Sequence, residues 1–176
     1  MKFCAFLRGV NVKGTNMKMA DVCKVFEDVG MKNVISVLAS GNIIFSSEKN
    51  VEELKPLLEK AMSNHFDYEA FLFVKSQVEV TECFQNNPFQ KDESLHIYAF
   101  VCNSDFDKKL MSEFQNSSKT ENEEAKIVNG YFYWQVPKGN TLDSTFGKIL
   151  GKKSMKDQLT SRNLNTFEKI LNKIQI

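Results

Sequence analysis

The pattern of apolar residues in this 176-residue chain predicts an α+β fold with antiparallel sheets. Apolar runs of strand length alternate with segments in which apolar residues recur at helical spacing. The order strand–helix–strand–strand–helix occurs twice along the chain. In addition, Asn129-Gly130 separates two strand-like runs. This dipeptide favours a tight hairpin because both central residues must adopt positive φ.

The first half opens with a strand over residues 2–7. A loop follows, and then a helix for which Gly30 is a suitable C-terminal cap. Residues 34–38 and 42–46 are predicted to be strands. Because Ser40-Gly41-Asn42 has the composition of a turn, we expect these two strands to pair antiparallel.

A second helix is predicted after Asn50, with Glu53 as the reciprocal partner of that N-cap. Pro56 conflicts with a helix that starts at the cap, because an interior proline costs about 3 kcal/mol. The helix should therefore either start late, near Leu54, or kink there, and we favour the late start. A strand over residues 70–74 completes the first half.

The second half repeats this order. Its predicted elements are a strand over 95–101, a helix over 106–114, hairpin strands over 126–128 and 131–136, and helices over 142–150 and 163–174. The last strand of the repeat has no counterpart in this prediction, and a C-terminal helix takes its place.

The repeated order is that of a ferredoxin-like unit. The sequence therefore predicts duplicated ferredoxin-like (βαββα) units with antiparallel sheets plus a C-terminal helix. The first unit is expected over residues 1–75 and the second, which includes the C-terminal helix, over 95–176. Residues 76–94 form the connector, with a short helix opened by Ser76 and Glu79.

The charges and cysteines exclude several classes of protein. Lys and Arg total 23 and Asp and Glu 22, so the net charge of +1 argues against a nucleic-acid partner. None of the four cysteines stands in a C-x-x-C pair, and Cys4 and Cys102 lie in apolar runs where we expect buried free thiols. No segment has the length and apolarity of a signal peptide or a membrane helix. We expect a cytoplasmic protein without a metal or cofactor.

The sequence contains no established catalytic motif. Its two histidines, His65 and His96, have no nucleophile or metal ligand nearby in sequence. The first candidate site is the loop after the first strand, where Arg8, Asn11 and Lys13 accompany two glycines. Such a loop before a helix attracts anions, although an ordinary turn explains it equally well.

A second candidate site precedes the last helix. Ser161 or Asn163 is suited to cap that helix, whereas Arg162 would be misplaced beside the positive end of a helix. That misplacement favours an anion as its partner. The aromatic run from Tyr131 to Trp134 could in principle stack bases, but core packing is the favoured interpretation.

Several motifs resemble those of a bacterial family of proteins of unknown function, DUF1697. They are Leu7-Arg8-Gly9-Val10-Asn11-Val12, Leu38-Ala39-Ser40-Gly41-Asn42-Ile43-Ile44-Phe45, Asn87-Pro88-Phe89, and Thr160-Ser161-Arg162-Asn163 with Thr166. The resemblance implies a duplicated ferredoxin-like fold and no known activity. The chain departs from the family where members usually have tryptophan, at Leu164, and serine-lysine, at Ser144-Thr145; Lys148 is a candidate replacement for that lysine.

The leading functional hypothesis is a binding module for a small anionic or phosphate-bearing ligand. The residues expected to bind it are Arg8, Asn11, Lys13, Ser40, Asn42, Arg162 and Asn163. Two alternatives stay open: an enzyme that acts on a phosphorylated or nucleotide substrate with the same residues, and a protein-interaction module that uses open sheet faces. The sequence does not predict an oligomeric state.

Overall fold

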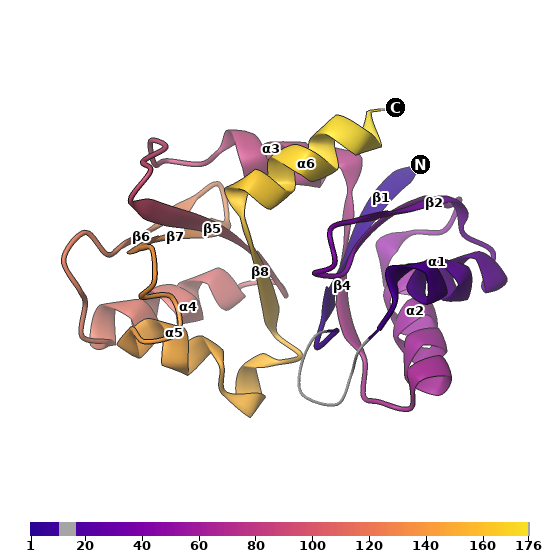
Figure 1. Cartoon of the computed structure of the whole chain (residues 1–176), viewed down its shortest axis with the longest axis horizontal. Helices are drawn as coiled ribbons and strands as arrows, with labels where there is room; N and C mark the ends of the chain where they lie inside the picture. The colour runs from indigo at the N-terminus through magenta and orange to yellow at the C-terminus, as the bar shows by residue number, and fades with distance from the viewer. Residues whose placement is uncertain (11–16, 176) are drawn as a thin grey trace. The chain divides into compact units, whose positions relative to one another are not determined.

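The computed structural model describes residues 1–10 and 17–175, and over these residues the α+β prediction is confirmed (Figure 1). The chain divides into two compact units, Met1–Thr81 with Glu168–Ile176, and Glu82–Phe167. The boundaries fall within two helices, α3 (Gln77–Gln85) and α6 (Leu164–Ile174). Each unit contains a four-stranded antiparallel sheet in the described part of the chain.

The sheet of the first unit has the order β2-β3-β1-β4. Its strands are β1 (Lys2–Arg8), β2 (Lys32–Val37), β3 (Asn42–Ser46) and β4 (Phe71–Ser76). β2 and β3 pair antiparallel as predicted, with Ile35 opposite Ile44 and Val37 opposite Asn42.

Two helices, α1 (Met19–Asp28) and α2 (Val51–Phe66), cover one face of this sheet. The core beneath them includes Phe3, Ala5 and Leu7 from β1, packed with Phe26 and Leu58 from the helices. Alternation along a strand puts every second side chain on one face, so the other residues of β1 point to the opposite face.

α2 begins at Val51, so the expected late start near Leu54 was wrong. Asn50 caps the helix: the Glu53 amide donates to Asn50 Oδ1 at 2.9 Å, and the Asn50 amide donates to Glu53 Oε2 at 3.1 Å. Pro56 lies inside the helix. The two cap bonds and the burial of Leu54, Leu58 and Met62 compensate for the hydrogen bond that the proline cannot donate.

The second sheet has the corresponding order, β6-β7-β5-β8. Its strands are β5 (Leu95–Cys102), β6 (Glu124–Val128), β7 (Tyr131–Pro137) and β8 (Leu159–Asn163). The prediction that a helix replaces the last strand was therefore wrong, because β8 completes the repeat before α6 begins. β8 is a polar edge strand, Leu-Thr-Ser-Arg-Asn, and short strands of this composition lack the apolar alternation that reveals a strand.

The predicted hairpin joins β6 and β7. Asn129 and Gly130 have φ values of 51° and 80°, and Val128 lies opposite Tyr131. β6 starts at Glu124, two residues earlier than predicted.

The core of the second unit is largely aromatic. It lies between one face of the sheet and two helices, α4 (Phe106–Asn116) and α5 (Thr145–Leu150), followed by the short 3-10 turn η1 (Lys153–Met155). Phe132 and Trp134 pack in this core against Phe146. Tyr133 is buried on the other face and donates to the Cys83 carbonyl at 2.7 Å. Core packing of the aromatic run is thus confirmed.

The four cysteines are free thiols. Cys4 is fully buried, as expected, but Cys102 is only half-buried because it ends β5. Across residues 1–10 and 17–175, no helix combines the length and apolarity needed to cross a bilayer.

Candidate functional site

Arg8 is the last residue of β1, where the first candidate loop begins. Phe3, Ala5 and Leu7 point into the core under α1 and α2. By alternation, Arg8 lies on the opposite face of the sheet, as Cys4 and Phe6 do. The chain leaves this position through Gly9, which has a φ of 80°.

The segment Leu7–Val10 packs against the turn that joins β2 to β3. The Leu7 amide donates to the Gly41 carbonyl at 2.8 Å. A Cβ on Gly41 would come within 2.9 Å of a Val10 methyl carbon and 3.0 Å of Leu7 Cβ, and Gly41 also has a φ of 76°. Only glycine fits here without strain, because both the close approach and the positive φ exclude a side chain. Two motifs that lie thirty residues apart in the sequence thus form one structure.

Asn42 holds this turn together. Its side chain is fully buried, and Nδ2 donates to the Val37 carbonyl at 2.8 Å and to Ser40 Oγ at 3.0 Å. Both amide hydrogens therefore serve the turn, as buried polar groups generally require. Asn42 and Ser40 support the loop end beside Arg8. Asn11 and Lys13 lie outside the residues that the structure describes.

Arg162 lies in β8, so the expectation that it opens the last helix was wrong. It is opposite Ala99 of β5, on the face of the second sheet turned away from α4 and α5. Its Nη1 donates to Thr160 Oγ1 at 2.7 Å and to the Ser161 carbonyl at 2.9 Å. Both acceptors are uncharged, and they fix the orientation of the guanidinium.

Asn163 lies on the opposite face from Arg162, because the two are neighbours in a strand. Its Oδ1 accepts a hydrogen bond from the Asn165 amide at 3.0 Å, which confirms its predicted role as a helix cap. Its Nδ2 lies 3.1 Å from His96 Nδ1. Burial, and secondarily the charge of Lys138, lower the pKa of His96. No local pattern predicts the His96–Asn163 contact, because 67 residues separate the two.

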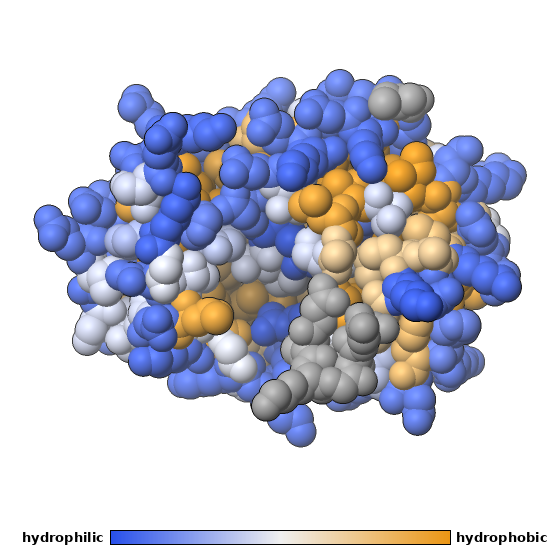
Figure 2. Space-filling model, viewed as in Figure 1, coloured by the Kyte–Doolittle hydropathy of each residue, from blue (hydrophilic) through white to orange (hydrophobic). Residues whose placement is uncertain are grey.

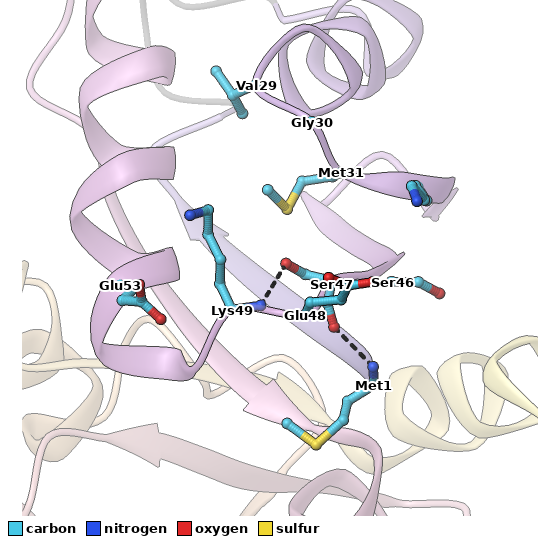
Figure 3. Close-up of a pocket in the computed structure, with 10 residues that line it drawn as sticks. Met1, Val29, Gly30, Met31, Ser46, Ser47, Glu48, Lys49 and Glu53 are labelled. Atoms are coloured by element: carbon cyan, nitrogen blue, oxygen red, sulfur yellow. Dashed lines mark hydrogen bonds between the residues drawn. The ribbon is translucent and has the colours of Figure 1, made fainter.

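The first unit also has an open hollow at the other end of its sheet, where β1 begins and β3 ends (Figure 3). Its volume is about 620 Å³, within the range of small-molecule sites. The walls come from the end of α1, the start of β2, the end of β3 and the first turn of α2. None of the predicted site residues that the structure describes lines it.

No cluster of three or more histidine, cysteine or acidic side chains is placed to hold a metal ion among residues 1–10 and 17–175. The first unit therefore offers Arg8, a loop end held by Asn42, and the hollow, and the second unit offers Arg162.

A family model described as a protein of unknown function (DUF1697) matches residues 1–133. The chain belongs to this family. The match includes the Leu7–Val10 and Leu38–Asn42 motifs, whereas β8 with Arg162 lies beyond the matched residues.

The conserved bacterial protein SP0830 from Streptococcus pneumoniae has a similar solved structure, with a TM-score of 0.78 and 22% sequence identity over 97% of each chain. This likeness shows the fold of the DUF1697 chain. A protein of unknown function from Galdieria sulphuraria matches with a TM-score of 0.27 and 8% identity over 92% of this chain and 96% of its own. No curated protein matches the chain.

Proposed function

We propose that this DUF1697 protein binds small anionic ligands at its two arginines, each as a site within its own unit, Arg8 in the first unit and Arg162 in the second. The observation that carries the proposal is that arginine is rare in this chain. The chain has 23 basic side chains, and Arg8 and Arg162 are the only two arginines. Lysine supplies the charge everywhere else.

Arginine and lysine differ in a way that makes this choice informative. A lysine ammonium is a compact, strongly hydrated charge, which suffices for solubility. The guanidinium is a planar fork that matches the geometry of carboxylate and phosphate groups. Because the chain uses lysine almost throughout, we infer that its two arginines stand where that fork is required.

The surroundings of the two arginines support the proposal. Arg8 lies beside a loop end whose backbone is held by Gly41 and the buried Asn42. Arg162 is oriented by the Thr160 hydroxyl and the Ser161 carbonyl. Preorganised donors bind anions more tightly than mobile ones, because less entropy is lost on binding.

An enzyme that acts on a phosphorylated or nucleotide substrate is a weaker alternative. His96 is the best candidate for a general base, since its lowered pKa favours the neutral form. However, its partner Asn163 and Arg162 lie on opposite faces of the sheet. A ligand bound on the Arg162 face would therefore be out of reach of His96.

A protein-interaction module is the other alternative. Figure 2 shows apolar side chains at the surface over β2 and α1, and Ile35 and Leu38 are each 44% exposed. β2 is an edge strand, but its register shifts between Lys32 and Ile35, and Asn33 has a φ of 52°. Such irregularities protect an edge from pairing with another chain, which weighs against this alternative.

Thermal unfolding with inorganic phosphate, sulfate and nucleotides tests the proposal. A hundredfold excess of ligand over its dissociation constant should stabilise the protein by about 2.7 kcal/mol. Arg8→Lys and Arg162→Lys keep the charge and lose the fork, so each should remove the part of that gain that comes from its own site while leaving the unliganded melting temperature nearly unchanged.

Lys60→Ala, an exposed change on α2, is the control and should respond to anions as the parent protein does. The proposal fails if no anion shifts the melt of the parent protein. It also fails if both lysine variants respond as the parent protein does, since charge alone would then suffice.

A further inference from the structure

We propose that the hollow at the start of β1 binds a small organic anion with an aliphatic body, such as a medium-chain carboxylate. This site is separate from the arginines and does not depend on the function proposed above. It is defined by an apolar floor with uncommitted hydrogen-bond donors beside it.

Fixed backbone forms the walls of the hollow. Ser47 exchanges two hydrogen bonds with Met1, at 2.7 Å and 3.0 Å. α1 ends in a tight turn in which the Gly30 amide donates to the Glu27 carbonyl and the Met31 amide to the Phe26 carbonyl. On the opposite side, α2 begins at the capping box of Asn50 and Glu53. A hollow with walls of this kind exists before any ligand arrives.

The floor is apolar. Met31 is buried, and Figure 3 shows its thioether pointing into the space between the end of α1 and the first turn of α2, with Val29 above it. A Cβ on Gly30 would meet nothing within 4 Å, so the space beside this turn is open. Methionine adapts its shape to aliphatic ligands, and burying a methylene group there is favourable.

The polar groups of the hollow supply donors. The Lys49 side chain extends into the same space as Met31 (Figure 3). Ser47 Oγ accepts a hydrogen bond from the Lys49 amide at 3.1 Å, which leaves its hydroxyl proton to donate. Within the described chain, neither the ammonium groups of Lys32 and Lys49 nor this proton has a partner.

The acidic groups do not cancel these charges. The Glu53 carboxylate accepts a hydrogen bond from the Asn50 amide and is committed to the cap of α2. Glu48 is the remaining acidic residue of the lining. The lining thus has two uncommitted ammonium groups and one uncommitted carboxylate, and this excess of positive charge favours an anion. A ligand whose carboxylate binds Lys49 would place its aliphatic chain over Met31.

The test is a titration with hexanoate, followed by the ε-methyl NMR signal of Met31, which Met31→Leu identifies. Hexanoate should move this signal in a saturable way. Acetate, which lacks the chain, and hexan-1-ol, which lacks the charge, should each bind more weakly. Equal binding of hexan-1-ol, or a Met31 signal that does not move, would overturn the proposal.

Charge variants sharpen the test. Lys49→Ala should weaken hexanoate binding by up to about fivefold, the upper limit for an exposed ion pair. Glu48→Gln should tighten it, because a repulsive charge is removed. Lys60→Ala, Arg8→Lys and Arg162→Lys should leave it unchanged, so that failure here is distinct from failure of the arginine proposal. An unchanged affinity in Lys49→Ala would refute the assignment.

Discussion

At the scale of single residues, this DUF1697 protein depends on a few side chains and glycines that make specific contacts. Gly41 lets the end of β1 and the β2–β3 turn touch, and Asn42 ties that turn to β2. Arg162 is oriented by two neutral acceptors, and His96 is paired with a residue of the last strand. The Leu7–Gly41 and His96–Asn163 contacts join positions that are distant in sequence.

Gly41→Ala should be more damaging than Gly30→Ala. Both positions have positive φ, 76° and 91°, which costs an alanine roughly 1 kcal/mol. Only at Gly41 would the new Cβ also collide with Val10 and Leu7, which adds about 1–3 kcal/mol of overpacking. Chemical denaturation of the two variants measures the difference. Equal losses of stability would show that the Val10 contact relaxes freely.

His96 should make the protein less stable as the pH falls. Its ordinary pKa is 6.5 and the folded-state pKa is lower, through burial and the charge of Lys138. Between the ordinary pKa and the lower folded-state pKa, the native state therefore binds fewer protons than the unfolded state. Stability declines as the pH falls below 6.5.

Melting temperatures at pH 7.5 and pH 5.5 measure this effect. His96→Gln should reduce the decline, whereas His65→Gln should retain it. A decline of the same size in both variants would assign the effect to other groups.

At the scale of elements, the two units differ in the helix that accompanies the edge strand, β4 in the first unit and β8 in the second. α2 has 16 residues, and its side chains complete the hydrogen bonds of β4: Glu59 Oε1 accepts from the Leu72 amide at 3.1 Å, and Lys55 Nζ donates to the Leu72 carbonyl at 3.0 Å. Lys55 and Glu59 also pair with each other at 2.6 Å. α5, in the corresponding place of the second unit, has only 6 residues.

Glu59→Ala should destabilise the first unit by about 1–3 kcal/mol, because it leaves the amide of the buried Leu72 without its acceptor. Lys108→Ala is a matched control, since its ion pair with Asp105 is exposed and worth under about 1 kcal/mol. Urea denaturation compares the two. A loss in Glu59→Ala no larger than in Lys108→Ala would mean that water replaces the carboxylate at Leu72.

At the scale of the whole molecule, the chain is a tandem repeat of one topology. Both sheets have the same strand order, and each repeat ends in a helix that contains a unit boundary, α3 or α6. The repeats have diverged in their helices and in their charged residues. Arg8 and the hollow belong to the first unit and Arg162 to the second, so each proposed site is a property of one repeat rather than of the shared fold.

The sequence by itself determined the features that depend on local geometry. Positive φ at Asn129 and Gly130 produces the hairpin, and the cap at Asn50 starts α2. Periodic apolar residues place most helices and strands, because side-chain direction repeats within each element.

Only the tertiary structure decided the rest. β8 is a strand because β5 offers it an edge to pair with, and that pairing moves Arg162 from a helix start to a sheet face. Pro56 stays in α2 because burial of the helix compensates for its missing hydrogen bond. The hollow is built from four elements whose ends meet only after folding. Such features rest on contacts between residues distant in the chain, which no local pattern encodes.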